Sequence, residues 1–147
     1  MGIIWMLVLD TNVVSEFMRP AMVSSVDRWL KTADRSEMFL TAITVAEVLY
    51  GIARMPDGRR KREAAAVIHE ILTELADRVI AFDVDSAVHY ADIVSQREFM
   101  GWPISAADGQ IAAICRQHGA TLATRNTKDF LHTGVTLIDP WTAGDTP

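Results

Sequence analysis

The residues best suited to chemistry in this 147-residue chain are carboxylates that follow short apolar segments. Asp10 directly follows the apolar run MLVL, and Glu47 and Asp108 lie in the segments TAITVAEVLYGI and ISAADGQIAAICRQHG. A fourth polar side chain, Asn126, follows the apolar run TLAT. Oxygen ligands of this kind bind hard divalent cations, most often Mg²⁺ or Mn²⁺. The sequence therefore predicts a metal site, provided that the fold brings these residues together.

The elements that must position these residues follow from the hydrophobic pattern. Five apolar runs are short enough for strands and mostly apolar on both alternating faces, which is typical of a buried parallel sheet. The predicted strands are Trp5–Leu9, Met38–Ala42, Val79–Phe82, Thr121–Ala123 and Val135–Ile138. The predicted helices are Val13–Met18, Val23–Thr32, Val45–Met55, Arg60–Asp77, Ser86–Met100 and Ala106–His118. This alternation predicts right-handed βαβ units and an α/β fold.

Such a fold places all four residues on one edge of the sheet. In βαβ units the carboxyl ends of the strands and the amino ends of the helices share an edge, and ligands bind there. Asp10, Glu47, Asp108 and Asn126 each lie at such a junction. Because clustered carboxylates repel one another, a divalent cation is their natural partner.

Each of these residues also has a purely structural explanation. Thr44-x-x-Glu47 and Ser105-x-x-Asp108 both match the capping box, and a single match of this kind is more often a helix cap than a catalytic group. Asp10 could cap a helix that begins near Val13, and Asn126 could shape an Asx-turn. These explanations predict no meeting of the four residues in space, so the fold distinguishes them from a metal site.

Composition limits the class of protein. The length and the 50% hydrophobic content predict one soluble domain over residues 1–147. The net charge of −5 argues against nonspecific binding to polyanions but allows a local nucleic-acid site. Cys115 is the single cysteine, which predicts a reducing, cytoplasmic location. The apolar opening meets Asp10 too early for a membrane span or a signal peptide, so we expect no membrane association.

Two basic features and one glycine allow functional or structural interpretations. The run Arg59–Arg62 could guide phosphates to the acidic edge, although a solvated helix face is the commoner explanation. Arg125 is better placed for a phosphate contact, or it pairs with a local acid. Gly109, next to Asp108, could admit an RNA backbone or permit close helix packing.

At this point the sequence resembles the PIN domain, and within that superfamily the VapC and FitB type of toxin ribonuclease. The matching segments are LVLDTNVVSE, LTAITVAEVLYGI, ISAADGQIAAICRQHGATLATRNTKDF and IDPW, in the same order and at similar spacing from Met6 to Trp141. The resemblance implies a three-layer α/β/α fold around a mainly parallel sheet of about five strands. It also implies a Mg²⁺-dependent endoribonuclease.

The resemblance further implies roles for the four edge residues. Asp10, Glu47 and Asp108 would carry the metal site, with Glu47 as a ligand or as the base that orients water. A metal-activated water would then attack the scissile phosphate. Asn126 stands where the family often has aspartate, so a second metal would be held more weakly unless Asp129 compensates.

Partners also follow from the resemblance. We expect the toxin of a type II toxin–antitoxin module: a homodimer, inhibited by a cognate antitoxin and contacting DNA only through it. The antitoxin would cover an exposed apolar set on the first helices, which comprises Phe17, Met18, Trp29 and Leu30. The alternative is a catalytically weak PIN-like module that binds RNA or protein. The intact Asp10, Glu47 and Asp108 argue against it, and Asn126 keeps it open. A small-molecule phosphohydrolase is disfavoured because no Asp-x-Asp pair ends the first strand.

Overall fold

The computed structural model describes residues 6–143, which form five parallel strands in a single sheet. The strands are β1 (Leu7–Leu9), β2 (Met38–Thr41), β3 (Val79–Ile80), β4 (Thr121–Ala123) and β5 (Thr136–Ile138). Their order across the sheet is β3-β2-β1-β4-β5, and every neighbouring pair is parallel. Strand β1 is therefore central, and the chain winds outward from it in both directions. The predicted parallel α/β sheet is confirmed.

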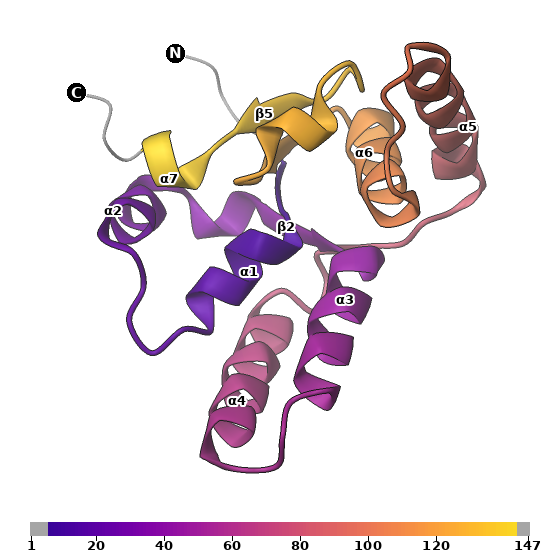
Figure 1. The fold of residues 1–147 in the computed structure, drawn as a ribbon. Coiled ribbons are helices and arrows are strands. Elements are labelled where there is room, and N and C mark those ends of the chain that lie inside the picture. The colour runs from indigo at the N-terminus through magenta and orange to yellow at the C-terminus, as the bar shows by residue number, and fades with distance from the viewer. Residues whose placement is uncertain (1–5, 144–147) are drawn as a thin grey trace.

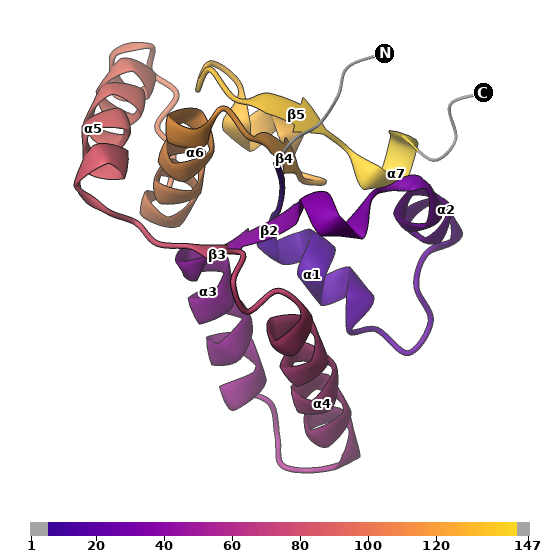
Figure 2. The same cartoon turned by 180° about the vertical axis from the view of Figure 1, so that it is seen from behind.

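Helices connect the strands and cover both faces of the sheet (Figure 1). They are α1 (Thr11–Phe17), α2 (Ser24–Thr32), α3 (Ala42–Ala53), α4 (Arg59–Glu74), α5 (Val84–Phe99), α6 (Ala106–His118) and α7 (Pro140–Ala143). Two 3₁₀ turns, η1 (Arg35–Glu37) and η2 (Thr127–Phe130), precede β2 and follow β4. Helices α3 and α4 lie side by side and project from the sheet in both views (Figures 1 and 2).

The three layers arise from the alternation of side chains along the central strand. Leu7 and Leu9 enter a core shared with α1, α2, α3 and α4, whereas Val8 enters a second core built largely from α5 and α6. Successive side chains of a strand point to opposite faces, so one apolar strand serves both cores. The three-layer α/β/α arrangement is confirmed.

Caps explain where the observed helices begin earlier than predicted. The Thr41 side chain accepts a hydrogen bond from the Thr44 backbone nitrogen at 3.0 Å, so β2 stops there and α3 begins at Ala42. Asp83 and Ser86 form a reciprocal capping box that starts α5 at Val84. The predicted strand start at Trp5 lies outside the described residues.

The expectation of an exposed apolar set on the first helices is wrong. Trp29 is buried, and Phe17, Met18 and Leu30 are partly buried against the same core. Trp29 of α2 belongs to the core cluster that contains Leu7 and Leu9 of β1, and α7 packs against α2. Large exposed apolar side chains lie elsewhere: Leu49, Tyr50, Val84, Val88, Phe99, Met100, Trp102 and Leu131. Within residues 6–143 no helix is long and apolar enough to cross a membrane.

Candidate active site

The structure brings all four predicted site residues to one open cleft at the carboxyl edge of the sheet. The cleft has a volume of about 520 Å³. Its lining comprises Asp10, Thr11, Asn12, Ser15, Glu16, Arg19, Glu47, Asp108, Arg125, Asn126 and Trp141. Asp10 follows β1 and Arg19 follows α1; the other side chains come from α1, α3, α6 and the segments after β4 and β5. The prediction that the four residues meet at one edge of the sheet is confirmed. Their separate structural explanations do not require this meeting.

Asp10 is a buried carboxylate, with 4% of its surface exposed. Its Oδ1 accepts a hydrogen bond from the Thr11 backbone nitrogen at 2.8 Å, which caps α1. Its Oδ2 accepts from Thr124 Oγ1 at 2.8 Å and from Asn12 Nδ2 at 3.2 Å. Burial raises the pKa of Asp10 and the charge of Glu47 adds to the increase, while the hydrogen bonds from Thr124 and Thr11 oppose it. The carboxylate is therefore fixed in one orientation at the floor of the cleft.

Two residues of this network were not assigned a role from the sequence. Thr124, which is fully buried, also accepts a hydrogen bond from the Asn126 backbone nitrogen at 3.0 Å. Asn12 Oδ1 accepts from the Arg125 backbone nitrogen at 3.1 Å. Together Thr124 and Asn12 join the end of β1 to the loop after β4. Their signal in the sequence was their position beside Asp10 and Asn126, in the segments DTN and TLATRN.

Glu47 faces the cleft from the second turn of α3 and is not part of a capping box. The predicted pair Thr44-x-x-Glu47 is wrong because α3 begins at Ala42, so Thr44 lies inside the helix. Glu47 Oε1 instead accepts a hydrogen bond from Thr11 Oγ1 at 2.6 Å. The second carboxylate of the site is thus tied to the residue next to Asp10.

Asp108 lies in the first turn of α6, as predicted, with Ser105 as the N-cap. Ser105 Oγ accepts a hydrogen bond from the Asp108 backbone nitrogen at 3.2 Å. Burial, and then the charge of Asp10, raise the pKa of Asp108 to about 6. Gly109 permits close helix packing: a Cβ there would lie 3.0 Å from Tyr90 Cε2 and Val94 Cγ2 of α5. The packing explanation of this glycine is therefore supported.

Asn126 lies at the rim and is exposed. It precedes η2 and makes no side-chain capping bond, so its amide is not used to shape the turn. Asp129 is also exposed, and its charge contributes to the raised pKa of Asp108. Asp129 does not line the cleft, however.

The basic run and Arg125 differ in their relation to the cleft. Lys61 hydrogen-bonds the Ala53 carbonyl at the C-terminal end of α3, away from the end that faces the site. Arg59 pairs with Glu63 at 2.7 Å. The structure thus places this run on a solvated helix face. Arg125 does line the cleft, where its guanidinium lies 5.1 Å from the centre of the Trp141 ring.

The donor set fits a hard cation that retains water. Within residues 6–143 no three Asp, Glu, His or Cys side chains stand close enough to hold an ion by themselves. Mg²⁺ usually takes one or two protein carboxylates and keeps several waters. Asp10 and Asp108 supply two carboxylates that interact electrostatically, and Glu47 supplies a third carboxylate in the same cleft.

Residues 7–135 match the PIN domain model, and the chain belongs to this family. Among its relatives are the VapC ribonuclease Y4jK of Sinorhizobium fredii, 41% identical over 92% of this chain and 98% of that protein, and the toxin FitB of Neisseria gonorrhoeae, 41% identical over 92% and 99%. The crystal structure of FitAcB from Neisseria gonorrhoeae contains a chain that superposes with a TM-score of 0.83 at 41% identity, covering 92% of this chain and 99% of that one. A FitAB complex bound to a DNA fragment gives a TM-score of 0.86 at 40% identity, with 92% and 96% covered.

Proposed function

We propose that this protein is a Mg²⁺-dependent endoribonuclease that acts as the toxin of a type II toxin–antitoxin module. The observation that carries the proposal is the convergence of Asp10, Glu47 and Asp108 on one open cleft. Relatives named as a ribonuclease and as a toxin, each 41% identical over almost their whole length, support it.

The carboxylates have different tasks in this proposal. Asp10 and Asp108 would hold the ion, and Glu47 would be a further ligand or the base that orients the attacking water. When bound, the ion lowers the pKa of a coordinated water and offsets charge on phosphate oxygens. Asp10 is already fixed by hydrogen bonds from Thr11, Asn12 and Thr124, so it needs little reordering on ion binding.

The cleft suits an extended polyanion better than a small enclosed substrate. It is an open depression, with Arg125 at the rim and the carboxylates within. We therefore assign RNA as the substrate, with Arg125 as a phosphate contact. An acidic protein of net charge −5 needs such local cations to hold RNA at all.

A cleavage assay tests the proposal. Purified protein is incubated with single-stranded and structured RNA, in Mg²⁺ and in EDTA. Asp10→Asn and Asp108→Asn should each reduce turnover at least about 10²-fold, because each removes a ligand charge from the site. Asp85→Asn, which removes an exposed carboxylate from the first turn of α5, is the matched control and should cleave normally. Cleavage that persists in EDTA, or full activity in both site variants, refutes the metal-nuclease proposal.

Glu47→Gln separates two roles at the third position. If Glu47 contacts the ion or the water, the variant should lose nearly as much activity as Asp108→Asn. If the variant cleaves normally, Glu47 has no role in catalysis, and its hydrogen bond with Thr11 is then a structural contact.

An antitoxin partner is supported by the relative named as the toxin FitB and by the similar solved structures of FitAB and FitAcB. An apolar cavity of about 230 Å³ lies between α1, α2 and α4, lined in part by Phe17, Met22, Leu30 and Ile71. We propose that the antitoxin occupies this region and extends an arginine toward the acidic cleft. Expression of the chain alone should slow bacterial growth, and co-expression of the adjacent small open reading frame should restore it.

A homodimer is the proposed oligomeric state. The exposed apolar side chains of α5, which include Val84, Val88 and Phe99, are the proposed contact surface between two copies. Light scattering on the purified protein should give twice the chain mass of 16.3 kDa.

The alternative function is a catalytically weak PIN-like module that binds RNA or protein. Asn126 favours it, since this position lacks the carboxylate often found in the resembling family. RNA binding without Mg²⁺-dependent cleavage, in wild type and in Asn126→Asp alike, would select this alternative.

A further inference from the structure

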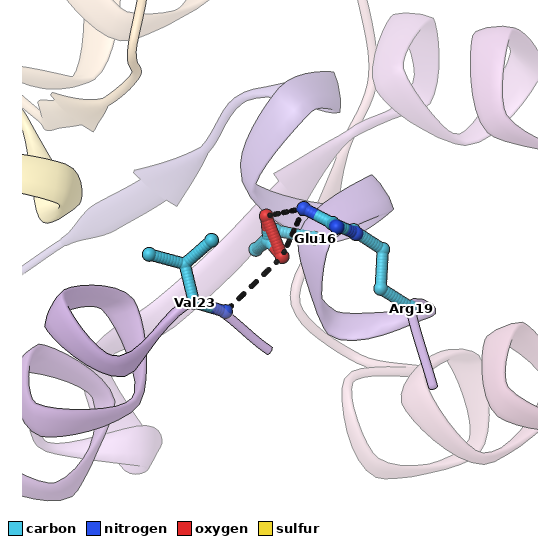
Figure 3. Close-up of polar contacts among 3 residues, drawn as sticks. All are labelled: Glu16, Arg19 and Val23. Carbon is cyan, nitrogen blue, oxygen red and sulfur yellow. Dashed lines mark hydrogen bonds and ion pairs between the residues drawn. The ribbon is translucent and has the colours of Figure 1, made fainter. Parts of the chain in front are cut away.

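A buried carboxylate and an exposed guanidinium form an ion pair at the C-terminal end of α1 (Figure 3). Arg19 Nη1 donates to Glu16 Oε1 at 3.0 Å and to Oε2 at 3.4 Å. The Val23 backbone nitrogen donates to Glu16 Oε2 at 3.5 Å. Only 4% of the Glu16 side chain is exposed, against 58% for Arg19. Glu16 is therefore fixed by its surroundings, and it holds the guanidinium through a single nitrogen.

Stability does not account for this arrangement. Removing a carboxylate from water costs free energy, and a partner that remains largely in solvent repays only part of that cost. Glu16 lies on the same short helix as the core residues Val13 and Val14, where an apolar side chain would pack without this penalty. What the buried charge does achieve is to fix the position of Arg19.

The free donors of Arg19 are available to the cleft. A guanidinium carries five N–H donors, and within residues 6–143 the hydrogen bonds of the Arg19 guanidinium use Nη1 alone. Both Glu16 and Arg19 line the cleft that contains Asp10, Glu47 and Asp108. Arg125 lines it from a different element, the loop after β4. The cleft lining thus contains two arginines: the Arg125 guanidinium lies over the Trp141 ring, whereas the Arg19 guanidinium is held by a buried carboxylate.

The length of α1 sets which part of a substrate Arg19 could reach. This helix begins beside Asp10 and has seven residues, so its far end lies about 10 Å away along the axis. Arg19 follows that end of the helix by two residues, so we assign to it a phosphate that neighbours the one at the carboxylates.

We propose that Arg19, held in place by Glu16, binds an RNA backbone phosphate next to the scissile phosphate. This inference rests on the proposed nuclease function. Arginine suits the task because its planar fork matches phosphate oxygens and its charge does not depend on pH near neutrality. Glu16 is a positioning residue in this scheme, because it acts through Arg19.

The test compares two double variants that leave the net charge unchanged. Glu16→Gln/Arg19→Gln removes the proposed contact without leaving a buried charge unpaired. Arg59→Gln/Glu63→Gln removes a similar exposed arginine with its glutamate partner from α4, outside the cleft. Both are made in wild type and in the Asp108→Asn background, where bound RNA is not cleaved. The probes are three labelled single-stranded RNA oligonucleotides of unrelated sequence, and thermal melting confirms that each variant is folded.

One lost phosphate contact predicts a specific change in salt dependence. For a single strand, each contact contributes about 0.7 to the slope of log K against log salt. The Glu16→Gln/Arg19→Gln variant should show a slope shallower by about 0.7 and binding about fivefold weaker at 0.1 M salt. The loss should be equal for all three oligonucleotides. In the active background KM should rise about fivefold, with kcat within twofold.

Arg19→Lys provides the rescue, because lysine keeps the charge and the pairing with Glu16. Its salt slope should match wild type. The Arg59→Gln/Glu63→Gln control should match wild type in slope, affinity and KM.

Several results would overturn the proposal. An unchanged salt slope in Glu16→Gln/Arg19→Gln, an equal loss in the α4 control, or a loss confined to one RNA sequence would each exclude a phosphate contact at Arg19. A fall in kcat with unchanged KM would do the same. If wild type cleaves RNA and the Glu16→Gln/Arg19→Gln variant behaves identically, this inference fails and the proposed function stands. Wild type that neither cleaves nor binds RNA removes the proposed function and this inference with it.

Discussion

Replacing Asp108 by asparagine should stabilise the metal-free protein near neutral pH while it reduces cleavage at least about 10²-fold. Burial and the charge of Asp10 raise the pKa of Asp108 from 3.8 to about 6. The folded state therefore binds this proton more tightly than the unfolded state does. Between pH 4 and pH 6 the unfolded chain loses the proton first, so the free energy of unfolding falls as pH rises. Above pH 6 the folded protein carries the full penalty of a charge that it disfavours.

The size of the penalty follows from the shift in pKa. A change from 3.8 to about 6 corresponds to about 3 kcal/mol if taken in full. Because the side chain is partly exposed, solvent screening reduces this, and asparagine also loses about 0.5 kcal/mol of interaction with the amino end of α6. We expect a net gain of about 1–2 kcal/mol above pH 6, equivalent to about 3–8 °C in melting temperature.

Thermal melting in EDTA between pH 4.5 and 8 measures this gain. The advantage of Asp108→Asn should be largest above pH 6 and shrink steadily as pH falls toward 4. Asp85→Asn is the matched control because it removes an exposed carboxylate from the first turn of another helix, and it should show no such gain. Adding Mg²⁺ should raise the melting temperature of wild type more than that of Asp108→Asn, since the ion offsets the repulsion at the site.

Two outcomes would refute this reasoning. If Asp108→Asn were less stable than wild type at pH 7.5 in EDTA, the carboxylate would be contributing stability rather than costing it. If the gain were the same at pH 4.5 and pH 7.5, it could not come from the ionised form of Asp108.

Three further substitutions test other parts of the site. Thr124→Val should destabilise the protein by about 1–3 kcal/mol in urea, because Asp10 loses a buried donor, and Thr124→Ser should restore most of it. Gly109→Val should cost at least about 2 kcal/mol and reduce cleavage, because even a Cβ would lie 3.0 Å from Tyr90 and Val94 at the start of the helix that carries Asp108. Asn126→Asp should tighten Mg²⁺ binding and slightly lower stability in EDTA; unchanged affinity by titration calorimetry would place Asn126 beyond the reach of the ion.

Local patterns in the sequence determined the kind of elements and their order. The short apolar runs became the five strands, of which β1, β2 and β4 are largely buried. The segment Ala106–His118 is a helix with the predicted bounds, which Ser105 caps and Gly119 ends in the left-handed conformation. Apolar residues on both faces of the central strand required a hydrophobic core on each side of the sheet. Leu7 and Leu9 pack in one core, and Val8 packs in the other. Because the carboxyl ends of parallel strands share an edge, the meeting of Asp10 with Asp108 was also predictable.

Cap partners were less predictable because several hydroxyl residues compete near each helix start. Thr41 and Thr44 are equally suitable by type, and only the path of β2 into α3 makes Thr41 the cap and leaves Glu47 for Thr11. Burial was similarly misjudged for Trp29, whose environment depends on where α2 and α7 pack.

The sequence by itself thus determined which carboxylates stand at strand and helix ends, since strand and helix periodicity are properties of short segments. Only the tertiary structure decided what holds them. The bond from Thr124 to Asp10 joins residues 114 positions apart, and the bond from Thr11 to Glu47 joins residues 36 apart. No local pattern encodes such pairs, because they form only when the folded sheet brings the ends of neighbouring strands and helices to the same cleft. The raised pKa of Asp108 has the same origin, since burial and the charge of a distant aspartate exist only in the folded chain.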